Sequence, residues 1–176
     1  MKFSAVARRM ADQDNRPLIF IVDTSSWLDI ERQTAQNRIL SALVPVIEAG
    51  RIKVPPEVWD EIEESSKLFE WLSPYRGRIV ENRRAKPDYL MLAGKIAHSF
   101  QGMAGVRGRR NKADPWVVAT AVHARSNPHV RVVVCNETVR RRPNRKMPTA
   151  CKAYEIECLS LFEMLDREYP DDGWLK

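Results

Sequence analysis

The sequence lacks the signatures of several common enzyme classes. It contains no GxxxxGK[ST] or GxGxxG string, so nucleotide-cofactor binding of the P-loop or Rossmann kind has no support. The nucleophile-elbow motif of serine hydrolases is also missing. The histidines His98, His123 and His129 do not share metal-ligand spacing and no cysteine joins them, which argues against a zinc site.

Cysteine and long apolar runs are scarce as well. The cysteines Cys135, Cys151 and Cys158 are odd in number and show neither CxxC nor zinc-like spacing, so we interpret them as reduced and mostly structural. No apolar run approaches the ~20 residues that span a bilayer, and the N-terminal stretch lacks the apolar centre of a signal peptide. We therefore expect a cytoplasmic protein without membrane association.

Positive charge is in excess, with a net charge of +6 and a pI near 9.4. This balance favours a polyanionic partner without identifying one. The basic residues cluster in RGRRNK (107–112) and RRRPNRK (140–146). Each cluster is either a solvated loop or a rim that binds phosphates. The candidate phosphate-binding residues are Arg107, Arg109, Arg110, Lys112, Arg140, Arg141, Arg142, Arg145 and Lys146.

Strand-like and helical segments alternate along the 176 residues. The apolar runs 18–22 (LIFIV) and 130–135 (VRVVVC) suit strands buried on both faces. Helical spacing extends over 25–49, where Pro45 is expected to kink or divide the helix, and over 55–72. The order β-α-β-α-α-α-β-α-β-α predicts an α/β fold, a three-layer α/β/α sandwich with a central parallel sheet of four to five strands.

The same pattern divides the chain into a flexible basic arm at 1–16, one domain at 17–169 and a C-terminal tail at 170–176. Ligands of such folds bind just beyond the carboxyl ends of the strands. The residues that follow the two apolar runs are therefore the first to consider for a site.

Two candidate acids lie at the starts of helices. Asp23 directly follows the first buried strand, and its ordinary role would be to cap the next helix. Thr24 and Ser25 stand beside it and could orient its carboxylate or a water. Asp114, followed by Pro115, is an equally good helix cap, worth about 1 kcal/mol. The functional interpretation of Asp114 is that its carboxylate lies at an exposed helix start.

Two further acids complete the set. Glu57, Asp60, Glu61 and Glu64 share one helical face, which usually means a solvated surface. Four acids on one face repel each other unless a metal or basic side chains relieve them. Among these four acids, Glu61 is favoured as the functional residue because it borders the buried side of the helix, which Val58 and Ile62 mark. Glu137 lies two residues beyond the second buried strand, where it could instead pair with neighbouring arginines.

The position of each acid alone favours a structural role. Together, however, the acids form a pattern: one follows each of two buried strands, one lies on a helix after a third strand, and one caps the helix that leads into the last. Oxygen ligands without His or Cys suit Mg²⁺ or Mn²⁺. Asp23, Glu61, Asp114 and Glu137 are therefore candidate ligands for such a metal ion. The tryptophans Trp27, Trp59 and Trp116 are candidates for base stacking, although their helical spacing favours core packing.

IVDTSSWLD, VPPEVWDEIE, KADPWVVATA and VVVCNET resemble strings of the PIN-domain family, and MPTACKAYEIECLSLFEML resembles the ending of a bacterial subgroup related to VapC-type toxins. The resemblance spans roughly residues 18–168. It implies that Asp23, Glu61, Asp114 and Glu137 are the family's acids, with Asn136 as a substitute at the fourth place and Thr24 or Ser25 as the supporting hydroxyl. Glu137 stands where Asp is commoner, and Cys135 where Thr is commoner.

The activity implied by this resemblance is hydrolysis of RNA by a divalent-metal-dependent endoribonuclease, leaving a 5′-phosphate. A protein antitoxin and a homodimer are further implied partners. The alternative is a non-catalytic nucleic-acid-binding protein on the same fold. Nothing in the residues separates RNA from DNA, so the choice of RNA rests on the resemblance alone.

Overall fold

The sheet is built from four parallel strands. The computed structural model describes residues 17–62, 66–101, 103, 113–124, 129–137 and 147–175. Its strands are β1 (Leu18–Val22), β2 (Ile52–Lys53), β3 (Val130–Val134) and β4 (Glu157–Leu159), in the order β2-β1-β3-β4. Every pairing between neighbours is parallel, as the alternation of elements predicts.

β1 and β3 form the centre of the sheet because both are continuous apolar runs. They pair over their full lengths, from Leu18 opposite Val130 to Val22 opposite Val134. All but the first residue of each strand is buried, as expected of strands covered on both faces. Since they run in register, β1 and β3 end at the same edge of the sheet, where Asp23 and Cys135 follow them.

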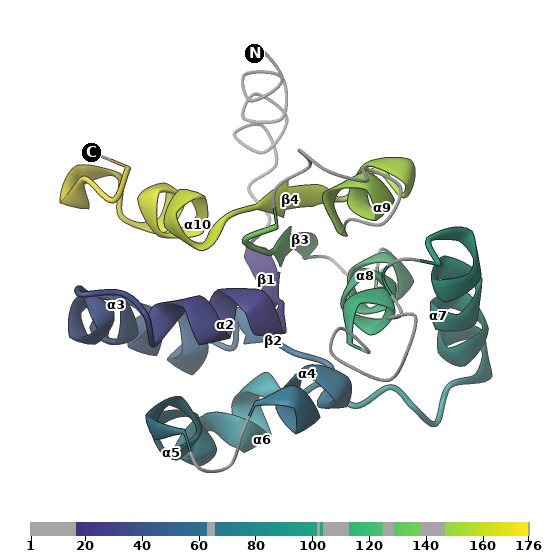
Figure 1. Ribbon diagram of the computed structural model, residues 1–176, viewed down its shortest axis with the longest axis horizontal. Coiled ribbons are helices and arrows are strands. Elements are labelled where there is room, and N and C mark those ends of the chain that lie inside the picture. Colours follow the sequence, from purple (N-terminus) through teal and green to yellow (C-terminus); the bar gives the residue numbers. More distant parts are fainter. Residues whose placement is uncertain are drawn as a thin grey trace.

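Helices cover both faces of this sheet, so the expected three-layer α/β/α arrangement is confirmed (Figure 1). One side carries α2 (Thr24–Ile30), α3 (Gln36–Glu48) and α10 (Leu161–Glu168). The other side carries α7 (Pro87–Ser99), α8 (Asp114–His123) and α9 (Met147–Ala153). Beyond the β2 edge lie α4 (Pro56–Glu61), α5 (Lys67–Leu72) and α6 (Arg76–Ile79).

Two long helices of the sequence prediction are each divided. The expected helix over 25–49 is α2 and α3, separated by turns in which Arg32 N–H donates to Asp29 C=O and Gln33 N–H to Ile30 C=O. Pro45 lies inside α3 and does not divide it, because it falls near the end of a helix whose apolar face is buried. The expected helix over 55–72 is α4 and α5, and Ser66 caps α5 through Phe69 N–H.

The β2 edge is extended by a single bridge and not by a fifth strand. Residues 78–80 end α6 and then form one parallel bridge between Val54 and Val80. Glu81 N–H donates to Val54 C=O at 2.9 Å. The bridge attaches the α4–α6 segment to the sheet and brings Glu81 close to it.

The C-terminal residues pack against the domain. Pro170–Asp172 forms a short 3₁₀ helix, η3, and Trp174 beyond it is 8% exposed. The Arg38 guanidinium lies 4.1 Å from the centre of the Trp174 ring and donates to Asp172 C=O at 2.6 Å. The segment expected to be a tail is thus tied to α3. The N-terminal arm, 1–16, lies outside the described residues.

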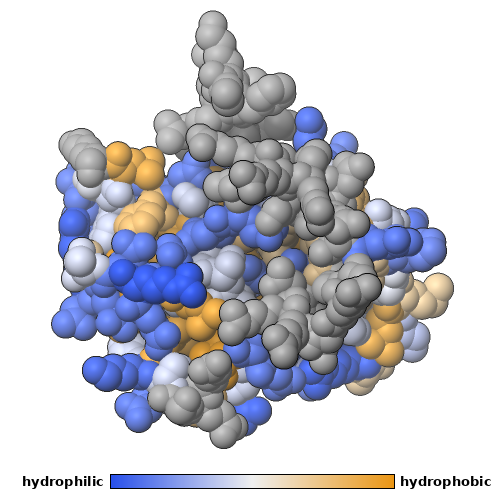
Figure 2. Space-filling model, viewed as in Figure 1, coloured by the Kyte–Doolittle hydropathy of each residue, from blue (hydrophilic) through white to orange (hydrophobic). Residues whose placement is uncertain are grey.

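Most of the described surface visible in Figure 2 is hydrophilic, and hydrophobic side chains form separate patches on it. Leu90 and Met91 of α7 and Leu175 are large hydrophobic residues exposed at the surface. Trp27 and Trp59 are buried, which confirms core packing as their role. No helix in the described part of the chain is long and apolar enough to cross a membrane.

Candidate active site

Asp23 is buried at the carboxyl end of β1, with 3% of its surface exposed. It caps α2, as its position in the sequence allows: the backbone N–H and the hydroxyl of Ser25 both donate to Oδ2, at 3.1 and 2.6 Å. The other carboxylate oxygen, Oδ1, is buried and has no hydrogen-bond partner among the described residues. A helix cap requires only one oxygen, so capping does not account for Oδ1.

The burial of Asp23 also changes its acidity. Loss of solvation raises the pKa of Asp23 from 3.8 to about 6 against the opposing hydrogen bonds from Ser25 and Thr24, and the negative charge of Glu61 adds to the rise. The ionised carboxylate is therefore poorly stabilised by the residues around it. A cation at Oδ1 would favour the ionised form.

Glu61 ends α4 and links three segments that are distant in the sequence. Its Oε2 accepts a hydrogen bond from Thr24 Oγ1 at 2.7 Å, and its Oε1 accepts one from the backbone N–H of Ala113 at 3.1 Å. Val58 and Ile62 are buried beside it, as the helical pattern predicts. The start of α2, the end of α4 and the start of α8 therefore meet at one carboxylate.

Asp114 is the first residue of α8 and is 4% exposed. The expectation that it is the N-cap of this helix is wrong, because Ala113 occupies the N-cap position. Asp114 lies one residue from the Ala113 N–H that holds Glu61. Asp23 and Asp114 are the two acids that are buried among the described residues.

The other acids of α4 belong to a separate surface contact. Arg84 Nε donates to Glu57 at 2.8 Å, and Arg84 Nη2 donates to Asp60 at 3.2 Å. A basic side chain therefore relieves the repulsion on this helical face, and Glu61 is the one described acid of the set that turns toward Asp23. Glu64 lies outside the described residues, as do all nine basic residues of 107–112 and 140–146.

Glu137 follows β3 and contacts the start of α9. Its Oε2 accepts a hydrogen bond from Met147 N–H, the first residue of α9, at 2.9 Å. Asn136 connects this segment to Asp23, because its backbone N–H donates to Ser25 Oγ at 3.4 Å. Glu61 thus contacts Thr24, the residue after Asp23, and the start of α8, while Asn136, the residue before Glu137, contacts Ser25.

Asp29 was not anticipated as part of this region. Its Oδ2 accepts from Asn136 Nδ2 at 2.9 Å and from Gln33 Nε2 at 3.1 Å, while Asn136 Oδ1 accepts from Leu161 N–H at 3.2 Å. Asn136 thereby joins α2, β3 and α10. The only signal in the sequence was an acid among the apolar residues of IVDTSSWLDI, which gives no partner.

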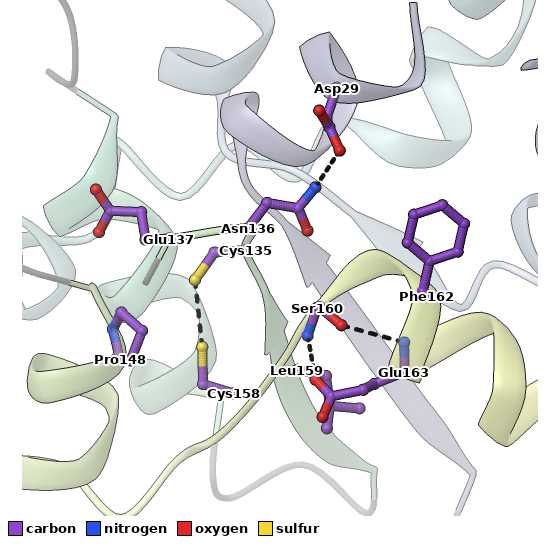
Figure 3. A pocket seen from close by; sticks show the side chains of 10 residues that line it. All are labelled: Asp29, Cys135, Asn136, Glu137, Pro148, Cys158, Leu159, Ser160, Phe162 and Glu163. Carbon is purple, nitrogen blue, oxygen red and sulfur yellow. Dashed lines mark hydrogen bonds between the residues drawn. The ribbon is translucent and has the colours of Figure 1, made fainter. Parts of the chain in front are cut away.

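A pocket of about 510 Å³ opens beside the acids, at the carboxyl ends of β3 and β4 (Figure 3). Asp29, Glu137 and Glu163 contribute carboxylates to it, and Pro148, Leu159 and Phe162 contribute apolar surface. Two thiols also line it, with Cys135 Sγ 3.4 Å from Cys158 Sγ.

The two thiols are not suited to nucleophilic chemistry. The contact with Cys158, together with burial, raises the pKa of the Cys135 thiol. Cys135 stays protonated at neutral pH, and the thiolate is the reactive form of cysteine. The pocket therefore offers acceptors and apolar contacts and no activated sulfur nucleophile.

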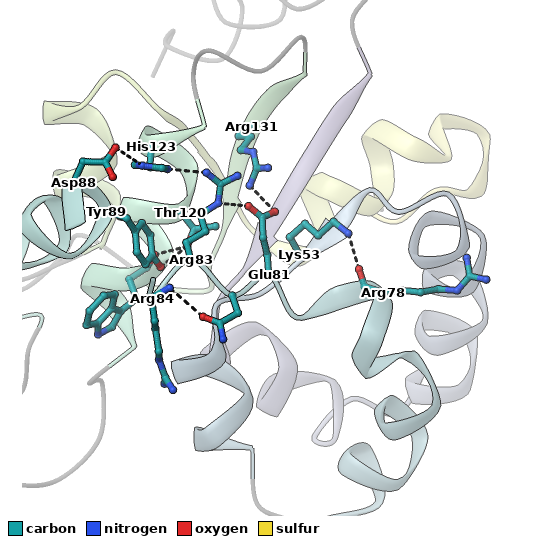
Figure 4. A network of polar contacts seen from close by, with 12 residues as sticks. Lys53, Arg78, Glu81, Arg83, Arg84, Asp88, Tyr89, Thr120, His123 and Arg131 are labelled. Carbon is teal, nitrogen blue, oxygen red and sulfur yellow. Dashed lines mark hydrogen bonds and ion pairs between the residues drawn. The ribbon is translucent and has the colours of Figure 1, made fainter. Parts of the chain in front are cut away.

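The opposite end of α8 is fixed by a chain of charged groups (Figure 4). Arg83 donates to Glu81 and, through Nη1, to His123 Nδ1 at 2.7 Å, and His123 Nε2 lies 2.8 Å from Asp88. Because Arg83 can only donate, His123 Nδ1 accepts and its Nε2–H donates to Asp88. Buried Arg131 completes the network, with Nη1 3.0 Å from Glu81 in an ion pair that lacks hydrogen-bond geometry.

The donor set at Asp23, Glu61 and Asp114 fits a hard divalent cation by its chemistry, since every donor is an oxygen and Asp23 Oδ1 is buried without a partner. Within the described ranges, however, no three His, Cys, Asp or Glu side chains are arranged to hold a metal ion. Hydrogen bonds from Thr24 and Ala113 engage both oxygens of Glu61.

Comparison with known sequences places the chain in one family. Residues 20–170 match the family described as "Domain of unknown function (DUF4411)", and the chain belongs to it. No curated protein and no solved structure matches the chain. The matched region contains every candidate acid, the supporting hydroxyls and the pocket.

Proposed function

We propose that this protein is a divalent-metal-dependent nuclease that hydrolyses RNA phosphodiester bonds, with Asp23, Glu61 and Asp114 as its principal catalytic acids. The observation that supports this proposal best is the buried, unpartnered Oδ1 of Asp23, on a carboxylate whose pKa is raised to about 6. Perturbed acids in contact with a second acid are typical of functional sites.

Different groups around Asp23 position each of the acids. Ser25 fixes one oxygen of Asp23 and leaves Oδ1 available, while Thr24 and Ala113 N–H fix the direction of Glu61. The acids are thereby held in place before any ligand arrives, which reduces the reorganisation that the reaction requires. When bound, Mg²⁺ or Mn²⁺ would supply positive charge to the scissile phosphate and activate a water molecule.

Glu137 takes the fourth acidic position in this proposal, as the resemblance to the PIN-domain family implies. Its contact with Met147 N–H gives it a structural role at the start of α9 as well. The basic clusters 107–112 and 140–146 would hold flanking phosphates, and a net charge of +6 supports a polyanionic substrate.

The resemblance to PIN-domain ribonucleases of the toxin type supports the choice of RNA as substrate. It extends the proposal to a cytoplasmic toxin of a toxin–antitoxin pair, held inactive by a protein partner, and to a homodimer. No contact of the described residues separates RNA from DNA, so both substrates belong in the first assay.

A non-catalytic nucleic-acid-binding protein is the second candidate. It is favoured by the hydrogen bonds that engage both Glu61 oxygens and leave no ready group of three metal ligands among the described residues. Under this alternative, RNA binding falls with salt but is unchanged by EDTA, and no RNA is cleaved.

The deciding experiment is incubation of total RNA and a matched single-stranded DNA with the protein in Mg²⁺ or Mn²⁺. Cleavage of RNA that stops on addition of EDTA, and that is lost in Asp23→Asn and Asp114→Asn, supports the nuclease. Asp60→Asn is the matched control, because this exposed acid of α4 faces Arg84 and away from the site. Full activity in Asp23→Asn and Asp114→Asn would reject the assignment.

A further inference from the structure

The pocket beside β3 and β4 is connected to the candidate active site through hydrogen bonds. Asn136, which lines the pocket, donates its backbone N–H to Ser25 Oγ at 3.4 Å, and Ser25 Oγ donates to Asp23 Oδ2 at 2.6 Å. Two hydrogen bonds, through Ser25, thus join this lining residue to the Asp23 carboxylate.

The charge of the described residues that line the pocket does not favour a phosphate as their ligand. Asp29, Glu137 and Glu163 give it three carboxylates, and none of the described residues that line it is Lys or Arg. A phosphate would be repelled by like charge at short range. A neutral group that carries N–H donors would instead find several acceptors.

The apolar walls suit a flat ligand. Phe162, Leu159 and Pro148 line the pocket, and Figure 3 shows Phe162 and Glu137 on either side of Asn136. Bases of single-stranded RNA stack on aromatic side chains and are identified by hydrogen bonds at their edges. A volume of about 510 Å³ is in the ordinary range for small-molecule sites.

The acceptors are fixed in direction before a ligand binds. Glu163 Oε2 accepts from Ser160 N–H at 2.8 Å in the capping box of α10, and Glu137 Oε2 accepts from Met147 N–H at 2.9 Å. Each carboxylate oxygen can accept a second hydrogen bond. Groups held in this way lose little entropy when they bind a ligand.

We propose that this pocket binds one base of the RNA next to the cleaved bond, and that it prefers guanine. This proposal rests on the nuclease function proposed above. Guanine presents N1–H and N2–H as adjacent donors, which a carboxylate can accept side by side, whereas adenine, cytosine and uracil present no such pair of adjacent donor nitrogens. Bidentate pairing of this kind typically discriminates against other bases by about tenfold or more.

The pocket can be tested without any cleavage. Guanosine, adenosine, cytidine and uridine are titrated into the isotopically labelled full chain in EDTA, and amide chemical shifts are followed. We expect guanosine to shift the signals of residues 135–137 and 159–163 and to bind about tenfold more tightly than the other nucleosides. Equal binding of all four nucleosides, or no shift at these residues, overturns the proposal.

Two variants give the test its specificity. Glu163→Gln keeps a capping-box acceptor for Ser160 N–H but removes a charge, and Phe162→Leu removes the ring. Both should weaken guanosine binding about fivefold or more, whereas Asp166→Asn, on the same helix and outside the pocket lining, should leave it unchanged. The amide spectra of the variants report whether each remains folded.

Cleavage mapping separates failure of this proposal from failure of the nuclease. A random RNA pool cut by the wild-type protein should show guanine enriched at one position beside the junction, and Glu163→Gln should flatten that preference. Cleavage without base preference overturns the pocket proposal but agrees with the proposed nuclease function. Guanosine binding with no cleavage of any RNA rejects the nuclease alone. Binding of arginine amide but not guanosine would assign the pocket to a cationic partner and overturn the proposal.

Discussion

The Thr24 hydroxyl donates a 2.7 Å hydrogen bond to the Glu61 carboxylate, across 37 positions of the sequence. This contact joins the first helix after the central strand β1 to the end of α4. Ala113 N–H holds the other oxygen of Glu61, so the direction of this acid is set from two sides. The geometry of the proposed metal site therefore depends on side chains and backbone groups that are not themselves acids.

Removal of the Thr24 hydroxyl should impair activity more than stability. Thr24→Val keeps the shape of the side chain but leaves Glu61 Oε2 without its donor, so the acid can move. We expect cleavage to fall roughly 10- to 100-fold and the free energy of unfolding to fall by about 1 kcal/mol. Thr24→Ser, which keeps the hydroxyl, should retain most activity, and equal activity in Thr24→Val would contradict the positioning role.

Asp23 should destabilise the metal-free fold at neutral pH. Its folded-state pKa of about 6 lies above the ordinary value of 3.8, so the folded state binds the proton more tightly and stability falls as pH rises between these values. The penalty is absent below pH 3.8 and complete above pH 6. The difference between these two pKa values corresponds to a loss of about 3 kcal/mol in the free energy of unfolding.

Asp23→Asn should therefore stabilise the protein in EDTA at pH 7, by up to about 3 kcal/mol, because Asn keeps a cap acceptor for Ser25 and carries no charge. The difference from the wild type should shrink as pH falls below 6 and vanish near pH 4. Denaturant unfolding at several pH values measures this. A variant less stable than the wild type at pH 7 would show that the Asp23 carboxylate is a structural group.

Glu81 should be important for stability and not for chemistry. Burial raises its pKa, but the positive charges of Arg131 and Arg83 outweigh this effect and lower it overall. Glu81→Gln would leave the buried Arg131 guanidinium without its counter-charge, at a cost of about 3 kcal/mol in the free energy of unfolding. Because the folded-state pKa is lowered, the wild-type contribution should disappear as pH falls through that pKa.

The control for Glu81 is Asp60→Asn, which removes a mostly exposed carboxylate from the Arg84 contact. Pairs of this kind contribute about 1 kcal/mol or less, so unfolding should be little changed. If Glu81→Gln were equally mild, the Arg131–Glu81–Arg83 network would not be what fixes β3 to the α6–α7 segment.

The sheet could be predicted because its main determinants are local. Two apolar runs bounded by polar residues marked β1 and β3, and the alternation of elements made them parallel neighbours. Their shared ends then placed Asp23 and Glu137 at one edge. Val58 and Ile62 identified the buried side of α4 and so singled out Glu61 from the acids near it.

The details of the site depend on contacts between distant segments, which the sequence pattern does not contain. Asp followed by Pro suggested a cap at Asp114, but the N-cap is Ala113, one residue earlier, whose N–H donates to Glu61. The division of hydroxyls, Ser25 for Asp23 and Thr24 for Glu61, follows from the same packing. No periodicity in the sequence pairs Asp29 with Asn136.

The most direct test of the central claim is titration of Mn²⁺ into the wild-type protein and into Asp23→Asn, followed by the loss of free Mn²⁺ signal in electron paramagnetic resonance. If a cation binds at the buried oxygen of Asp23, the wild type and Asp60→Asn should both bind Mn²⁺. Asp23→Asn should lose this Mn²⁺ binding. Equal Mn²⁺ binding by the wild type and Asp23→Asn, or none by the wild type, would contradict the account.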